Sequence, residues 1–225
     1  AHDASWLRLP DGSAEHVETP LYEIHFAPDG AILSLWDKAL GREWARSANF
    51  NRLHLYADNP GNYDAWDILP NYKDKEYALT VAEPLTLLET DGECATFSCT
   101  LKTEKSTWRR LIRVFRASPM IEVENDVDWH ELHRLLKVAF PVDVRAEMAQ
   151  HEMQFGFVER PTHRSRGYDQ QRFEVCNHRY TALCDNSHGC AVLNDSKYGV
   201  GVEQNSIELT LLRAAASPEM GTDQG

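Results

Sequence analysis

Short runs of alternating apolar and polar residues, bounded by residues that favour turns, fill most of this 225-residue chain. Residues 21–26 (LYEIHF) and 32–36 (ILSLW) both alternate with period two, and Pro28-Asp-Gly30 lies between them. Because proline fixes φ and glycine tolerates positive φ, this stretch predicts a β-hairpin. Helical periodicity is poor throughout the chain, so the pattern predicts an all-β protein.

Turn residues also separate the remaining strand-like runs. Strands at this spacing are typical of a sandwich or barrel. No linker rich in Gly, Ser or Pro divides the chain, so we expect one domain over 20–213, between irregular segments at 1–19 and 214–225 that are either flexible or the cut ends of a longer chain. Residues 131–136 could form a short helix or a loop. Further strands are predicted at 76–90, 94–102, 108–115, 120–127, 135–144, 148–157, 172–184, 189–193 and 207–212.

The overall charge argues against two classes of partner. The formal net charge is −12 and the pI is near 5.2. Such a surface repels phosphate backbones and anionic lipid head groups, so we expect neither nucleic acid nor a membrane as a partner. No run approaches the roughly 18 apolar residues of a membrane helix.

The cysteine count suggests the compartment. Five is an odd number, and no two of the cysteines form a Cys-x-x-Cys pair, which fits neither a complete disulfide framework nor a zinc knuckle. Reduced thiols in the cytoplasm are the expectation, and the N-terminal residues show no signal-peptide layout. The cysteines are Cys94, Cys99, Cys176, Cys184 and Cys190.

An aromatic and acidic motif, residues 63–67 (YDAWD), follows a turn-forming stretch at 58–62. Aromatic faces bind the apolar face of a sugar ring, and carboxylates accept hydrogen bonds from its hydroxyls. The alternative interpretation is structural: the motif is an Asp-rich turn, and Trp66 packs in the core. In an extended segment, residues three apart point to opposite sides, so Asp64 and Asp67 alone are not expected to form a hydrolytic pair.

The segment 129–133 (WHELH) raises the question of a metal site. Its histidines, His130 and His133, lie three residues apart, whereas the zinc motif of metalloproteases needs them four apart on a helix. No third ligand is obvious in the sequence. We therefore assign no metal ligand and no catalytic residue to this chain.

Charged and polar residues are packed among β-forming residues in the runs 160–163 (RPTH), 172–179 (RFEVCNHR) and 193–199 (LNDSKYG). Such residues are rarely interior unless they are hydrogen-bonded or functional. These runs therefore predict either a buried polar network or the wall of a site. The five members that we single out are Arg160, His163, Arg172, His178 and Arg179.

The motifs occur in an order that resembles one family, the C-terminal β-region of α-mannosidases of glycoside hydrolase family 38. The resemblance covers roughly residues 20–220 and is greatest to the cytosolic and bacterial type. Besides the polar runs above, it rests on residues 41–43 (GRE), 51–55 (NRLHL), 63–68 (YDAWDI), 127–131 (VDWHE), 136–141 (LKVAFP), 154–156 (QFG) and 209–213 (LTLLR).

The resemblance implies a large antiparallel β-sandwich of the galactose-mutarotase-like supersandwich kind. It also implies that an upstream α/β barrel, joined through a helical domain, hydrolyses terminal α-mannosides with retention. That barrel would hold the Asp nucleophile and a zinc ion, whose motifs are absent from this chain. We therefore expect activity of a cytoplasmic parent enzyme and not of the isolated chain. The implied partners are an α-mannoside and the upstream domains of the same polypeptide. Whether the protein forms a homo-oligomer is left open.

The resemblance also implies roles for residues. A loop of the β-region reaches the barrel's active site in this family, which implies substrate contacts by Tyr63, Asp64, Trp66 and Asp67. The five charged residues singled out above would form either a polar core or a face docked on the barrel.

Two other functions stay open. A free-standing sugar epimerase of the mutarotase kind needs a histidine base and a carboxylate near the anomeric carbon, which His163 or His178 with Glu174 could supply. A non-catalytic carbohydrate-binding module would use Tyr63 and Trp66 as a platform.

Overall fold

The computed structural model describes residues 4–61 and 63–215. Contacts divide the chain into two compact units. Unit 1 combines the residues up to 52 with residues 79–130, and unit 2 combines residues 53–78 with those from 131 onward. Neither helix of the described residues has the length and apolar character needed to cross a membrane.

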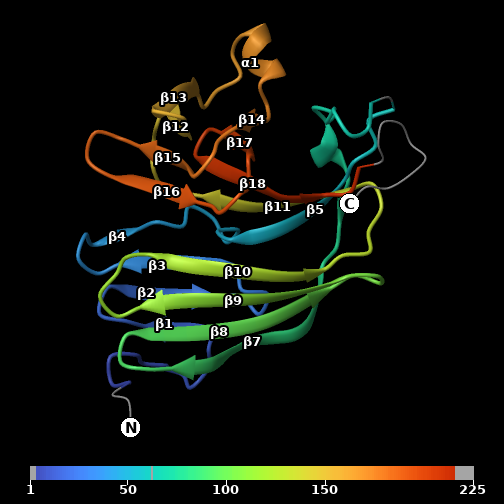
Figure 1. Ribbon diagram of the computed structural model, residues 1–225. Helices are drawn as coiled ribbons and strands as arrows, with labels where there is room; N and C mark the ends of the chain where they lie inside the picture. Colours follow the sequence, from blue (N-terminus) through green and yellow to red (C-terminus); the bar gives the residue numbers. More distant parts are fainter. Residues whose placement is uncertain (1–3, 62, 216–225) are drawn as a thin grey trace. The chain divides into compact units, whose positions relative to one another are not determined.

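Unit 1 contains two four-stranded antiparallel sheets, each with its strands in chain order (Figure 1). The first sheet consists of β1 (His16–Glu18), β2 (Tyr22–Phe26), β3 (Ile32–Asp37) and β4 (Arg42–Glu43). The second consists of β7 (Thr80–Thr90), β8 (Cys94–Lys102), β9 (Thr107–Phe115) and β10 (Ile121–Asp128).

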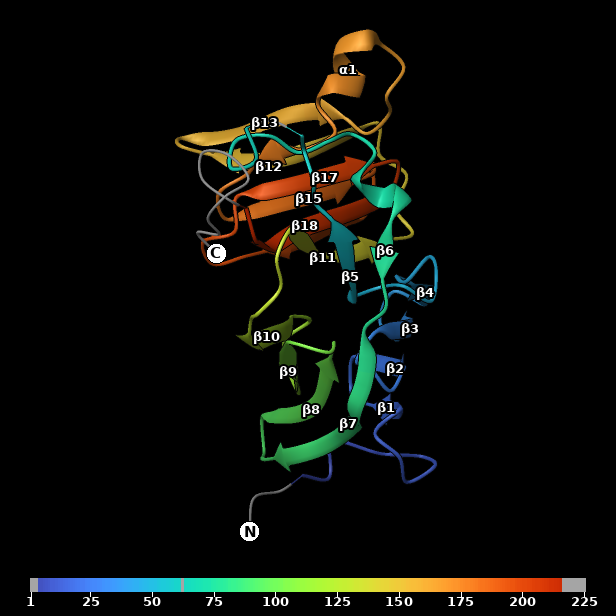
Figure 2. The ribbon, with the colours of Figure 1, turned by 90° about the vertical axis from the view of Figure 1, so that its right-hand side faces the viewer.

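The two sheets of unit 1 face each other in both views and share an apolar core (Figures 1 and 2). Alternate residues of β2 and β9, and most of the apolar residues of β8, point into it, as period-two patterning predicts. Phe26 on β2 meets Phe97 on β8 with ring centroids 5.8 Å apart, and Ile24 and Ile112 are fully buried. The alternation seen in the sequence is therefore produced by burial of one face of each sheet.

The hairpin predicted at residues 21–36 is confirmed, since β2 pairs with β3 in the antiparallel sense. β7 with β8, and β9 with β10, form two further antiparallel hairpins. Gly30, in the first turn, has φ +78°, and a Cβ there would lie 2.9 Å from the side chain of Ile112. Both the backbone angle and the close approach therefore require glycine.

Unit 2 contains a six-stranded and a four-stranded sheet, together with the 3₁₀ helix η1 (Tyr72–Asp74) and the helix α1 (Gly167–Gln171). The larger sheet has the order β14 (Val175–Cys176), β17 (Gly199–Glu203), β18 (Ser206–Arg213), β11 (Arg134–Pro141), β5 (Arg52–Ala57) and β6 (Glu76–Tyr77). The smaller has the order β13 (Gly156–Pro161), β12 (Met148–Met153), β15 (Tyr180–Cys184) and β16 (Gly189–Leu193).

The predicted single large antiparallel β-sandwich of the galactose-mutarotase-like kind is wrong, although nearly all the described regular structure is β. The strands form four separate small sheets of four, four, six and four strands. Periodicity identifies a strand and its buried face, but it carries no information about partners distant in the chain. β5 and β11 are neighbours in one sheet, yet the whole of β7–β10 lies between them in sequence.

Several boundaries also differ from the predictions. The segment 148–157 holds two strands, because Phe155 and Gly156 adopt positive φ (+69° and +157°) and turn the chain between β12 and β13. Residues 131–136 contain no helix, and β11 begins at Arg134. Several elements were not predicted from the sequence, namely β1, β4, β5, β17, η1 and α1.

The predicted domain boundaries, one domain over 20–213 with irregular flanks at 1–19 and 214–225, stay a prediction. β1 begins within the first flank. Residues 216–225 of the second flank lie outside the described residues.

A buried cation organises the interior of unit 1. Arg110 on β9 is fully buried, and its guanidinium donates hydrogen bonds to the backbone oxygens of Asp29 (2.9 Å) and Asn51 (3.0 Å) and to Oδ1 of Asn51 (2.9 Å). Asn51 in turn donates to the backbone oxygen of Gly30 at 3.1 Å. Burial lowers the pKa of Arg110. Its hydrogen bonds compensate for lost hydration and hold the turn between β2 and β3.

We expect Arg110→Ala to lower the free energy of unfolding by about 3 kcal/mol, because it leaves several buried acceptors without a donor. Arg113→Ala is the matched control on the same strand, since it removes only surface ion pairs to Glu122 (2.6 Å) and Glu124 (2.9 Å) and should cost less than about 1 kcal/mol. Urea unfolding measures both. Equal losses would contradict a structural role for the buried guanidinium.

Candidate functional site

The predicted sugar-contacting motif lies in the loop that follows β5. Trp66 and Asp67 both donate their backbone N–H to the carbonyl of Tyr63, at 2.8 and 3.0 Å, which closes one tight turn. Tyr63 has φ +56°. The turn stacks the rings of Tyr63 and Trp66 with centroids 5.7 Å apart and planes 18° apart. Their exposures are 58% and 73%, so the pair presents an aromatic surface to solvent.

Arg213, the last residue of β18, holds this loop. Its guanidinium donates to both carboxylate oxygens of Asp58 at 2.5 and 3.2 Å. It also donates to the backbone oxygen of Asp64 at 2.6 Å and to that of Asp67. Burial raises the pKa of the Asp58 carboxyl, and the neighbouring Arg213 opposes that rise. The guanidinium of Arg213, at the end of β18, thus holds the turn through the carbonyls of Asp64 and Asp67, and its ion pair holds Asp58 just before the turn.

The four residues of the motif have different surroundings. The side chain of Asp64 is fully buried, with Oδ2 at 3.3 Å from Nδ1 of His133. Asp67 is exposed, and its Oδ1 accepts from the backbone N–H of Ile68 at 3.0 Å. Tyr63, Trp66 and Asp67 can therefore meet a ligand from solvent. Asp64 has the surroundings of a structural carboxylate, and its role as a substrate ligand stays a prediction.

The five charged residues of the polar runs do not line one site. Arg160, His163 and Arg172 line a cavity next to α1, together with His151 and Asp169. Its volume is about 20 Å³. That is room for a water molecule and not for a sugar ring. The small volume around Arg160, His163 and Arg172 favours a polar core over the wall of a sugar site.

His178 and Arg179 line a second, open hollow of about 640 Å³ with Asn194 and Tyr198. The rings of His178 and Tyr198 meet edge to face at 5.6 Å. A volume of this order is within the range of small-molecule sites. Both residues lie in the bend between β14 and β15, and not on the continuous strand predicted over 172–184, so they line the hollow from a loop.

Unit 2 also contains a buried polar network around Lys137 that was not predicted from the sequence. Lys137 is fully buried on β11, and its Nζ donates to Glu174 Oε1 (2.5 Å) and to Thr210 Oγ1 (2.9 Å). The hydroxyl of Tyr72 donates to the same Glu174 oxygen at 3.0 Å. Burial lowers the pKa of Lys137, and burial followed by the charge of Glu174 raises that of Tyr72. A lysine inside the otherwise apolar run 136–141 was the feature of the sequence that could have predicted this network.

The space beside Glu174 requires a glycine. A Cβ on Gly201 would lie 2.8 Å from Glu174 Oε1 and 3.0 Å from the backbone oxygen of Phe173. Glu174 is thus enclosed and paired with Lys137, so its surroundings give no support to the epimerase that would use it as an open catalytic carboxylate.

The two histidines of residues 129–133 have separate partners. His130 Nε2 lies 2.8 Å from Asp128 Oδ1 in unit 1, whereas His133 Nδ1 lies 3.3 Å from Asp64 Oδ2 in unit 2. Each histidine therefore contacts a different carboxylate, and the absence of a zinc site at these histidines stays a prediction.

Residues 17–220 match the model of the family described as "Glycosyl hydrolases family 38 C-terminal domain". Human alpha-mannosidase 2C1 is 33% identical over 219 residues, which is 96% of this chain and 21% of the relative. Alpha-mannosidase G of Dictyostelium discoideum is 32% identical over 225 residues, which is 93% of this chain and 20% of the relative. The chain spans about a fifth of the length of these relatives.

A solved structure shows the same fold. The crystal structure of an alpha-mannosidase from Enterococcus faecalis V583 superposes with a TM-score of 0.72 at 14% identity. The superposition covers 89% of this chain and 26% of that one. The arrangement of separate small sheets therefore occurs within a much longer polypeptide.

The buried histidine of the small cavity predicts a pH dependence of stability. His151 is 1% exposed, and burial, with Arg160 nearby, lowers its pKa from 6.5 to about 4. The folded protein thus holds His151 neutral where the unfolded chain protonates it. The stability associated with neutral His151 is fully present above about pH 6.5, and it is lost as the pH falls to about 4.

We expect His151→Gln to flatten the decline in unfolding free energy between pH 6.5 and pH 4, measured by urea titrations at several pH values. His163→Gln is the control, because it makes the same substitution at an exposed histidine of the same cavity, and it should change the slope less than His151→Gln does. A slope unchanged in His151→Gln would contradict the assignment.

Proposed function

Because the chain belongs to the family of glycosyl hydrolases family 38 C-terminal domains, we propose that it is the C-terminal domain of an α-mannosidase and lends one wall to the substrate site. Hydrolysis of terminal α-mannosides, with retention at the anomeric carbon, would be carried out by an upstream catalytic barrel. A helical domain would join the two. The relatives' length, about five times that of this chain, supports such a division.

The stacked pair of Tyr63 and Trp66 carries the proposal. Sugars present apolar C–H faces that pack on aromatic rings. An exposed ring held by a fixed turn loses little conformational freedom on binding. Arg213 supplies that fixation through Asp58 and the loop carbonyls. Asp67 is exposed at the same turn, and in this proposal it would accept a hydrogen bond from a hydroxyl of the sugar ring that packs on the aromatic pair.

The zinc ion of such an enzyme would be held by the barrel and not by the loop described here. Bound there, it would act as a Lewis acid that holds and polarises substrate oxygens. The loop residues do not fit that ion, because the carboxylate of Asp58 is engaged by Arg213 and that of Asp64 faces His133. The part of this chain in the reaction is therefore to bind and orient the sugar.

The remaining assignments follow from the same division. The partners would be an α-mannoside and the upstream domains of the same polypeptide, docked in part through the charged residues of unit 2. The acidic surface, with a net charge of −12, disfavours nucleic acid and anionic membranes. Five cysteines without disulfides support a cytoplasmic location.

One observation favours a second candidate, a carbohydrate-binding module that acts without a catalytic partner. The same aromatic pair is open to solvent within this chain alone. Calorimetric titration of the chain with mannose oligosaccharides tests it, since heat that disappears in Trp66→Ala would mark binding by this surface.

In the complete polypeptide, we expect Trp66→Ala to lower kcat/KM for an α-mannoside about tenfold, which corresponds to about 1.4 kcal/mol of lost transition-state binding. The matched control is Trp36→Ala, which removes an exposed tryptophan (41% exposed) from unit 1 and should leave kcat/KM unchanged. Steady-state kinetics on both variants provides the measurement. Unchanged kinetics in Trp66→Ala would remove the loop from the substrate site.

The isolated chain of residues 1–225 should not turn over an aryl α-mannoside, because the nucleophile and the zinc ligands lie elsewhere in the proposal. Release of the aryl alcohol, followed by absorbance at high protein concentration, measures this. Turnover that survives repurification and disappears in Asp67→Asn would show a self-contained catalytic site and contradict the proposed division.

A further inference from the structure

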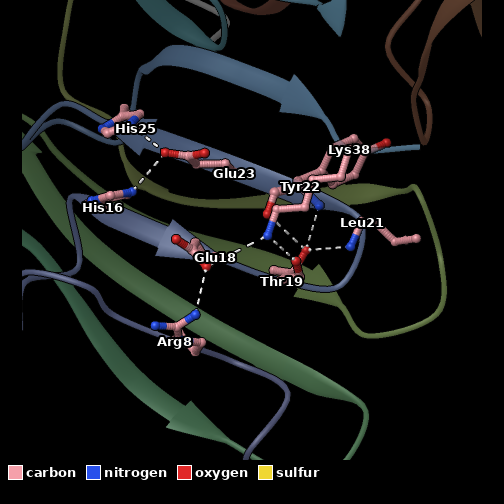
Figure 3. A network of polar contacts seen from close by, with 9 residues as sticks. All are labelled: Arg8, His16, Glu18, Thr19, Leu21, Tyr22, Glu23, His25 and Lys38. Atoms are coloured by element: carbon pink, nitrogen blue, oxygen red, sulfur yellow. Dashed lines mark hydrogen bonds and ion pairs between the residues drawn. The ribbon is translucent and has the colours of Figure 1, made fainter. Parts of the chain in front are cut away.

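Two histidines and a glutamate converge on the outward face of the first sheet of unit 1. His16 lies on β1, and Glu23 and His25 lie on β2 (Figure 3). Val17 and Ile24 between them are fully buried, so strand alternation turns the other three outward. His16 is directly opposite His25 in the antiparallel register, and Glu23 lies two residues before His25 on the same face.

A single carboxylate oxygen lies between the two imidazoles. Glu23 Oε1 is 3.2 Å from His16 Nε2 and 3.5 Å from His25 Nε2. The imidazole rings stack with centroids 4.2 Å apart and planes 23° apart. One ligand atom from each residue can be chosen so that all three lie within 4.8 Å of one another.

These separations are those of ligands around one metal ion. Zinc binds imidazole nitrogen and carboxylate oxygen at about 2.0–2.1 Å, so neighbouring ligands of a tetrahedral site lie about 3.4 Å apart. Both histidine–glutamate distances are close to this value. The third separation, between one nitrogen of each imidazole, is no more than 4.8 Å.

The neighbouring charges leave this site available. Glu18 on β1 lies opposite Glu23 in the register, and it is paired with Arg8 at 3.3 Å and Lys38 at 3.8 Å (Figure 3). Within residues 4–61 and 63–215, the ion pairs of Glu23 are both to histidines. The three side chains keep 21–44% of their surface exposed, so an ion can enter and keep a water ligand.

We propose that His16, Glu23 and His25 bind one divalent transition-metal ion of the Zn²⁺ type, with solvent in the remaining position. Two imidazoles and one carboxylate suit zinc, cobalt, nickel or copper, whereas magnesium and calcium prefer oxygen ligands alone. The bound ion joins β1 to β2 and stabilises unit 1 by mass action. This site is independent of the mannoside proposal, whose residues belong to unit 2.

The test titrates the purified chain with Zn²⁺ by calorimetry and with Co²⁺ by visible absorption. We expect one Co²⁺ ion whose d–d bands indicate nitrogen and oxygen ligands. His16→Ala and Glu23→Gln should each weaken binding at this site by about tenfold or more, as loss of a ligand does. Cysteine thiolates give a separate charge-transfer band, so any cobalt bound to them is distinguished from this site.

The matched control is His130→Ala. It removes an exposed imidazole of the same unit that also contacts a carboxylate, that of Asp128 at 2.8 Å, and it should bind Co²⁺ as the original chain does. Zn²⁺ should raise the thermal midpoint of the original chain and of His130→Ala more than that of His16→Ala.

Two outcomes would overturn the proposal. One is equal cobalt affinity and spectra in the original chain, His16→Ala and Glu23→Gln. The other is a cobalt spectrum that shows only thiolate ligands. Because Glu23→Gln preserves the size of the side chain, the comparison remains decisive if His16→Ala folds poorly.

Discussion

The ion pair between Arg213 and Asp58 determines how the candidate site is presented. The two residues are distant in sequence, and they meet because β18, β11 and β5 are successive neighbours in one sheet. Removing one member of a buried pair leaves an uncompensated charge, at a cost of about 3–5 kcal/mol. The same guanidinium holds the carbonyl of Asp64. The exposed aromatic pair is therefore supported by rigid sheet structure although it belongs to a loop.

Buried cations recur as structural elements in this protein, whereas the residues of the two proposed binding sites are exposed or partly exposed. Arg110 holds a turn in unit 1, and Lys137 holds Glu174 and Thr210 together in unit 2. Each is surrounded by hydrogen-bonding partners that compensate for burial. The groups open to solvent are the aromatic pair of the loop and the histidine cluster on β1 and β2.

Local features of the chain were predictable and long-range pairings were not. Pro28, Asp29 and Gly30 specify a turn through their own backbone preferences, so the first hairpin followed from the sequence. Phe155 gave no such signal, because a bulky residue rarely has positive φ, and one predicted strand proved to be two. The burial of Asp64 and the separation of His163 from His178 depend on strand order, which periodicity does not encode.

The most direct measurement is a crystal structure of the complete polypeptide with an uncleaved α-mannoside analogue bound. The account predicts ring atoms of Tyr63 or Trp66 within about 4 Å of the sugar carbons, with the loop held by Arg213 as in the isolated chain. A bound sugar with both rings remote from it, facing solvent or packed on protein, would contradict the central claim.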